Sequence, residues 1–97
     1  MACEPRSPEI SEPDYDLAWI DHAGVVNVAE VKSLTAQNES VQLRLGLGQL
    51  IEYRYRLSAK WGNVKGVLFV ERAPTDAEQW SLICEDVDVA LDWPRLD

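Results

Sequence analysis

Cysteine and histidine are scarce in this sequence, which contains two cysteines and one histidine. Cys3 and Cys84 lie far apart and match no metal-ligand spacing, so neither a disulfide framework nor a cysteine-based zinc site is supported. We expect one thiol in the N-terminal tail and one buried thiol. His22 falls in a short turn after Asp21, and no second histidine is present to build a histidine-based metal site.

Long apolar runs are absent as well. No segment approaches the roughly 20 apolar residues that span a bilayer, and the N-terminus has neither the basic nor the apolar region of a signal peptide. We therefore expect a cytoplasmic protein without a membrane partner. The 97 residues allow one domain, and a hydrophobic content of 46% with four tryptophans and three tyrosines is enough to form a core.

Basic side chains are outnumbered, since 9 Lys and Arg face 17 Asp and Glu, for a net charge of −8. This excess disfavours a nucleic-acid partner, because phosphate binding depends on Lys and Arg. The distribution is uneven, however, because residues 44–65 contain a single acid, Glu52. The basic strip in this segment is compatible with binding a phosphate backbone. It comprises Arg44, Arg54, Arg56, Lys60 and Lys65.

The first half of the chain divides into four segments. Residues 1–13 contain three prolines and predict an extended arm, with regular structure beginning near Asp14 in a domain of residues 14–97. Residues 15–20 and 25–32 are rich in strand-forming side chains and flank a polar turn, which predicts an antiparallel hairpin. Residues 38–57 alternate as a strand does but also carry an apolar stripe at helical spacing, and we favour a helix with Asn38 as its N-cap.

The second half predicts two more strands and a helix. Residues 64–71 contain an apolar run typical of a central strand covered on both faces. Thr75 and Glu78 have the spacing of a capping box, which predicts a helix over residues 76–86. Residues 87–93 alternate and indicate a strand at the sheet edge. The inner face of the helix would carry Trp80, Ile83 and Cys84.

The resulting order of elements, β-β-α-β-α-β, predicts an α/β fold. Its mixed β-sheet would begin with an antiparallel hairpin and continue through right-handed crossovers with flanking helices.

Three side chains of the predicted hairpin suit phosphodiester hydrolysis. Glu30 and Lys32 are two residues apart on one strand and therefore share a face, and Asp16 on the other strand can supply an opposing carboxylate. Two carboxylates can hold Mg²⁺, or Mn²⁺, while a lysine positions or helps to deprotonate the attacking water. The backbone carbonyl of Val31 would be a further oxygen ligand. The alternative is a surface cluster in which Glu30 and Lys32 form an ordinary ion pair.

These motifs resemble the PD-(D/E)XK nuclease superfamily, whose members place a hairpin before a helix and another strand. Tyr15-Asp16-Leu17, a glycine-containing turn and Ala29-Glu30-Val31-Lys32 carry the resemblance, and Gln49 to Tyr53 is similar to the Q-x-x-x-Y helix motif of one branch. The resemblance implies a restriction-endonuclease-like core and a Mg²⁺-dependent deoxyribonuclease, with Asp16, Glu30 and Lys32 as catalytic residues. On a helix Gln49 and Tyr53 lie one turn apart, and with Arg56 and Lys60 they are candidates for contacting DNA.

The sequence departs from this family before the first carboxylate. The family has a helix and a strand there, whereas this chain has the proline-rich arm. The domain could be trimmed, a homodimer or a larger parent protein or complex could supply the missing elements, or Glu9 or Glu12 could substitute. Asp14, which follows Pro13, competes with Asp16 as a metal ligand, and we prefer Asp16 because its spacing to Glu30 and its inward face fit better.

Two other kinds of function remain open. One is a non-catalytic module of the same fold that binds proteins or anchors DNA, and the other is an unrelated acidic α/β binding protein.

Overall fold

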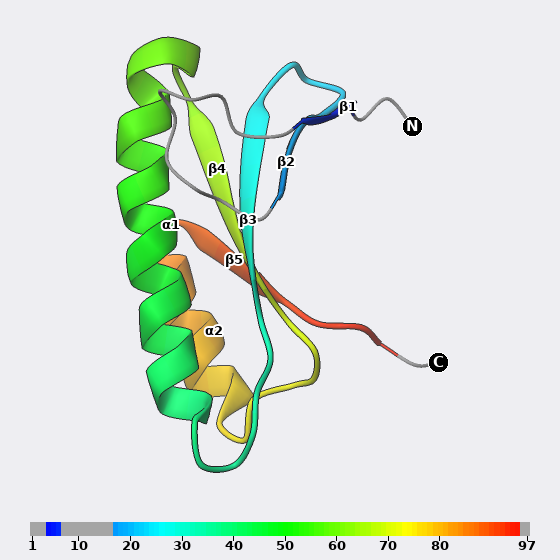
Figure 1. Ribbon diagram of the computed structural model, residues 1–97, viewed down its shortest axis with the longest axis vertical. Coiled ribbons are helices and arrows are strands. Elements are labelled where there is room, and N and C mark those ends of the chain that lie inside the picture. Colours follow the sequence, from blue (N-terminus) through cyan, green and yellow to red (C-terminus); the bar gives the residue numbers. More distant parts are fainter. Residues whose placement is uncertain (1–3, 7–16, 96–97) are drawn as a thin grey trace.

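The computed structural model describes residues 4–6 and 17–95, which form a five-stranded sheet and two helices (Figure 1). The elements in chain order are β1 (Glu4–Arg6), β2 (Leu17–Ile20), β3 (Val26–Lys32), α1 (Glu39–Trp61), β4 (Val64–Val70), α2 (Ala77–Asp86) and β5 (Val89–Asp92).

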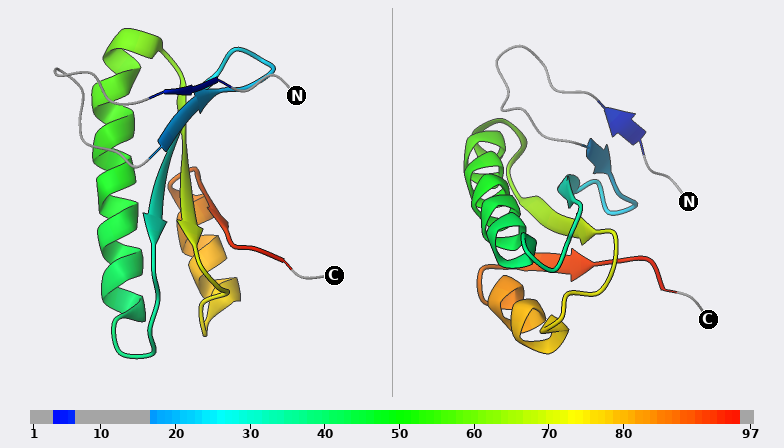
Figure 2. Two further views of the ribbon diagram at one scale, coloured as in Figure 1. Left: turned by 45° about the vertical axis from the view of Figure 1, so that its right-hand side comes forward. Right: turned by 60° about the horizontal axis from the view of Figure 1, so that its bottom comes forward.

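The strands follow one another across the sheet in chain order. β2 is antiparallel to both β1 and β3, whereas β3, β4 and β5 are parallel. Parallel neighbours need a crossover, which α1 supplies between β3 and β4 and α2 supplies between β4 and β5. This arrangement confirms the α/β fold and the mixed sheet, and from β2 onward it confirms the β-β-α-β-α-β order, with β4 inside the sheet and β5 at its edge (Figures 1 and 2).

The hydrophobic core lies between one face of the sheet and the helices. Alternate positions of β3 and β4 point toward α1, and Cys84 of α2 joins the same cluster. Burial raises the pKa of the Cys84 thiol, in agreement with the expected buried cysteine, while Cys3 lies outside the described residues. The core side chains of β3, β4 and α1 are Val26, Val28, Val64, Leu68, Val70, Leu43, Leu50, Tyr53 and Leu57.

Helix α1 confirms the helical interpretation of residues 38–57 and extends it to Trp61. Leu43, Leu50 and Leu57 are seven residues apart, which is close to two helical turns, so all three meet the sheet. The helix ends at Gly62, whose φ of 76° lies in the left-handed region and whose N–H donates to the carbonyl of Ser58 at 2.9 Å. This glycine turns the chain directly into β4.

One expectation for the N-terminal segment is wrong. Regular structure does not begin near Asp14, because Glu4–Arg6 already forms β1 and pairs with β2. Pro5 stands opposite Trp19 in that pair, at the edge of the sheet, where proline is tolerated because its missing N–H can face outward.

The prediction of a capping box at the start of α2 is also wrong. Asp76 is the N-cap and makes no side-chain capping bond. The Thr75 hydroxyl instead donates to Oε2 of Glu39 at 2.9 Å, so a tertiary contact replaces the local one. On the predicted inner face, Trp80 packs on the core, but Ile83 is largely exposed.

The face of the sheet opposite the helices is less covered than the sequence indicated. Val67 and Phe69 of β4 are half-buried there, so the apolar run of β4 is not fully covered on both faces. Within the described part of the chain, neither α1 nor α2 combines the length and apolar character needed to cross a membrane.

Candidate functional site

Strand β3 places Glu30 and Lys32 on the face that α1 covers. Val26 and Val28 precede them at the same alternation and are buried in the core, whereas Val31 points to the opposite face and is exposed. Glu30, near the end of β3, is only 4% exposed, which is unusual because carboxylates are rarely buried unless they are paired.

Glu30 and Lys32 form an ion pair inside the protein. Lys32 Nζ lies 3.2 Å from Glu30 Oε1, and 13% and 6% of the two side chains are exposed. Removing such charges from water costs several kcal/mol per ion before their attraction is counted. This burial distinguishes the pair from the exposed surface cluster that we considered as the alternative.

Gly46 of α1 makes room for the lysine. A Cβ at this position would lie 2.6 Å from Leu68 Cδ1 and 3.2 Å from Lys32 Cγ. The missing side chain therefore lets α1 approach the sheet closely and cover the aliphatic part of Lys32. We did not single out Gly46 from the sequence, although a glycine inside a helix, where it is unfavourable, was the available signal.

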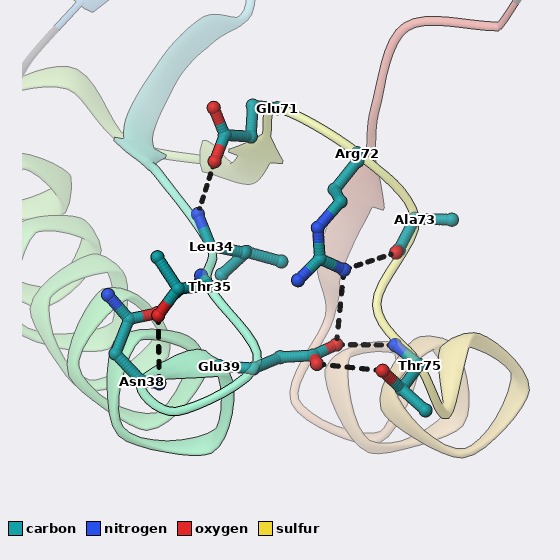
Figure 3. A network of polar contacts seen from close by, with 8 residues as sticks. All are labelled: Leu34, Thr35, Asn38, Glu39, Glu71, Arg72, Ala73 and Thr75. Carbon is teal, nitrogen blue, oxygen red and sulfur yellow. Dashed lines mark hydrogen bonds and ion pairs between the residues drawn. The ribbon is translucent and has the colours of Figure 1, made fainter.

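A polar network holds the chain beyond this end of β3 (Figure 3). Oε1 of Glu39 accepts a hydrogen bond from Thr75 N–H and lies 3.8 Å from Arg72 Nη1, while Leu34 N–H donates to Oε1 of Glu71 at 2.8 Å. These contacts tie the loop after β3 and the first residue of α1 to the loop after β4. Because the partners are separated by 36 and 37 residues, no local motif reveals them.

The two residues of the helix motif lie one turn apart on α1, as predicted. Tyr53 is buried in the core, which is the structural role considered for it. Gln49 is half-buried, and its Oε1 atom is buried without accepting a hydrogen bond from the described residues.

Arg56 and Lys60 are exposed near the other end of α1. Arg56 Nε lies 2.9 Å from Glu52 Oε2, and Lys60 Nζ lies 5.2 Å from the centre of the Trp61 ring. At about 1.5 Å per residue, Arg56 and Lys60 are roughly 15 and 21 Å along the helix from Gly46. The fold therefore does not bring these basic side chains next to the Glu30 and Lys32 pair.

The remaining candidate ligands, Asp14 and Asp16, lie outside the described residues, as do Glu9 and Glu12. Among residues 4–6 and 17–95, no group of three or more His, Cys, Asp or Glu side chains could hold a metal ion. A metal centre at Glu30 would therefore need a ligand from elsewhere.

Comparison with known proteins identifies the fold. No protein family and no curated protein matches the sequence. Among solved structures, the chain is similar to the crystal structure of a repair endonuclease from Pyrococcus abyssi, with a TM-score of 0.67 and 20% sequence identity. The match covers 98% of this chain and 39% of that one, so the chain spans about two fifths of the repair endonuclease. The α/β fold described above is thus shared with part of an endonuclease.

Proposed function

We propose that this chain is the core of a metal-dependent deoxyribonuclease of the PD-(D/E)XK type, with Glu30 and Lys32 in its active site. The observation that carries the proposal is the buried ion pair between these two side chains, covered by α1 at Gly46. Its position in a fold shared with a repair endonuclease favours nuclease chemistry over the other uses of a buried pair.

Asp16, which lies outside the described residues, is the proposed second carboxylate. Ala18 pairs with Val28 and Leu17 pairs with Ala29. These pairs place β2 beside the strand that carries Glu30. Asp16 is preferred to Asp14 because its spacing to Glu30 in the sequence fits better.

The donor set fits a hard divalent cation. The carboxylates of Glu30 and Asp16 and the carbonyl of Val31 offer the oxygen ligands that Mg²⁺ or Mn²⁺ prefers. A bound cation would supply a water of lowered pKa and positive charge at the phosphate.

The two described site residues have distinct roles in this proposal. The Glu30 carboxylate would hold the cation, and it forms the ion pair that keeps the Lys32 ammonium in place. Lys32 directs its remaining N–H donors at the attacking water and at the phosphate oxygens, where negative charge increases in the transition state. Partial exclusion of water strengthens both interactions.

The helix residues extend the proposed DNA surface away from the reacting phosphate. Gln49 has a buried acceptor that a donor from bound water or substrate would satisfy, and Tyr53, one turn later in the core, would fix the position of Gln49. Arg56 and Lys60, roughly 15 to 21 Å along α1, would contact phosphates about four to six nucleotides away, at about 3.4 Å per nucleotide.

Cleavage of supercoiled plasmid and of single-stranded DNA tests the proposal. With Mg²⁺ or Mn²⁺ the parent should cut one or both substrates, and a chelator should stop the reaction. Glu30→Gln and Lys32→Ala should each reduce the rate at least about 100-fold, as expected for groups that act on the transition state. The controls Glu78→Gln and Arg95→Ala alter exposed side chains and should retain the parental rate.

Two outcomes count against this assignment. Cleavage that persists in both site variants would mean that the activity arises elsewhere. A parent that cuts neither substrate with either cation would favour the non-catalytic interaction or DNA-anchoring module.

A further inference from the structure

Helix α1 has a second apolar face that is separate from the core. Val41, Leu45, Ile51 and Tyr55 are all exposed, Leu45 by 48% and Tyr55 by 80%. Helix α1 lies at the outer edge of the molecule (Figure 1). The four exposed positions are distinct from Leu43, Leu50 and Leu57, which are buried against the sheet. Exposed apolar side chains gathered on one helix are a common feature of protein-interaction surfaces.

These side chains are arranged symmetrically about Gly48. Leu45 and Ile51 are three residues before and after it, and Val41 and Tyr55 are seven residues before and after it. Residues three and seven apart share one face of a helix, so the four form one stripe with Gly48 at its centre.

Gly48 itself is not explained by contacts within the chain. A Cβ at this position would meet no heavy atom of residues 4–6 and 17–95 within 4 Å, in contrast to Gly46, where it would clash. Glycine weakens a helix relative to alanine, so its presence here has a cost without an internal benefit. A backbone that lacks a side chain at the centre of an apolar stripe is suited to close approach by another helix.

Two charged residues within the stripe follow the same symmetry with opposite sign. Arg44 is four residues before Gly48 and Glu52 is four residues after it, and both are exposed.

We propose that this face binds a second copy of the chain, with the two α1 helices antiparallel about a two-fold axis through Gly48. In such an isologous interface, a residue a given number of positions before Gly48 meets the residue the same number after it in the partner. Leu45 then packs on Ile51 of the partner subunit, Val41 packs on the partner's Tyr55, and Arg44 pairs with the partner's Glu52.

Charge complementarity selects this arrangement over a parallel one. Parallel helices would place Arg44 beside its own copy and Glu52 beside its own copy, and like charges at such positions repel. The antiparallel pair converts both repulsions into attractions and leaves the opposite side of α1, where Gly46 covers Lys32, unchanged. The proposal does not depend on the roles of Glu30 and Lys32, and in the dimer Glu52 would share its carboxylate between Arg56 and the partner's Arg44.

Sedimentation equilibrium of the full chain tests the dimer. The parent should dimerise with a dissociation constant in the micromolar range or below, and Leu45→Asp should raise that constant at least about 30-fold, as for a central interface residue. Leu82→Asp is the matched control, because Leu82 is also an exposed leucine, 59% accessible, but lies on α2. A parent that stays monomeric at about 100 μM, or equal effects of the two variants, would overturn the proposal.

Charge reversal and a distance measurement test the antiparallel geometry. Arg44→Glu should weaken the dimer about tenfold, and adding Glu52→Arg should restore it. Spin labels on Ala59→Cys, in a Cys3→Ser background where Cys84 stays buried, should be at least about 33 Å apart in an antiparallel pair at about 1.5 Å per residue. Labels closer than about 20 Å would indicate parallel helices and contradict the two-fold axis at Gly48.

Discussion

Lys32 Nζ lies 3.2 Å from Oε1 of Glu30, and both side chains are almost entirely covered by the protein. A buried ion pair rarely stabilises a fold more than apolar side chains of the same size would, although removing one partner is strongly destabilising. Comparing the free energy of unfolding of variants that lack one partner or both therefore measures what the pair contributes to folding.

Lys32→Met should lower the free energy of unfolding by about 3 kcal/mol, because it removes the ion pair that Lys32 forms with the buried Glu30 carboxylate. Adding Glu30→Gln should recover most of that loss, since no uncompensated charge remains. Urea unfolding of the parent, both single variants and the double variant measures the coupling. The exposed pair provides the control, because Arg56→Met removes an ion pair with Glu52 and should cost less than about 1 kcal/mol. A double variant as unstable as Lys32→Met would show that the pair is a net source of stability.

Gly46→Ala should destabilise the protein by about 1 to 2 kcal/mol although alanine favours a helix. The new Cβ would lie 2.6 Å from Leu68 Cδ1, and Leu68 is fully buried and has little room to move. Gly48→Ala meets no atom within 4 Å and should stabilise the protein by about 0.5 to 1 kcal/mol. Both changes are best compared by urea unfolding in the Leu45→Asp background, which removes any effect of self-association. Equal effects of the two substitutions would mean that α1 does not approach the sheet closely at Gly46.

The exposed apolar side chains of α1 explain why this segment was hard to interpret from the sequence. Apolar side chains on its outer face, such as Val41 and Leu45, interrupt the simple helical stripe and create the alternation of a strand. The inner positions Leu43, Leu50 and Leu57 nevertheless repeat at two helical turns, which was sufficient to predict the helix. Strong local periodicity therefore predicted the central elements of the sheet and the face shared by Glu30 and Lys32.

Contacts between distant segments could not be predicted in this way. The three residues of β1 are too few to show a period, and their pairing depends on the free edge of β2. Thr75 has the sequence context of a capping residue, but the Glu39 carboxylate, 36 residues earlier, accepts its hydrogen bonds instead. The tightness of α1 against Lys32 likewise depends on Leu68, which is in another element.

Glu39→Ala should lower the free energy of unfolding by about 2 to 3 kcal/mol. Glu39 accepts hydrogen bonds from the backbone N–H and the hydroxyl of Thr75, and its loss leaves these partly buried donors unsatisfied. Thr75→Val removes the hydroxyl donor alone and should cost about 1 kcal/mol. Glu85→Ala, at an exposed position of α2, is the control for loss of a negative charge. Hydrogen exchange gives a second measurement, since the Thr75 amide should lose protection in Glu39→Ala, and unchanged protection would contradict the contact.

Asp21 should make the stability of the hairpin depend on pH at acidic values. Its Oδ2 accepts a hydrogen bond from Asn27 Nδ2 at 3.0 Å, and its Oδ1 accepts from the N–H groups of Val25 and Ala23 at 3.1 and 2.9 Å. These bonds, that of Asn27 above all, hold the pKa of the Asp21 carboxyl below its usual value of 3.8.

Because the folded pKa is depressed, the ionised carboxylate stabilises the fold fully above about pH 5, and this contribution is lost as the pH falls through the usual value and then the folded one. Asp21→Asn should therefore lower the melting temperature at pH 7 and have a smaller effect near pH 2, where the parent carboxyl is also uncharged. Asp86→Asn, an exposed aspartate at the end of α2, is the control. A difference between parent and Asp21→Asn that is constant from pH 7 to pH 2 would show that the side-chain geometry at this turn, and not its charge, carries the stabilisation.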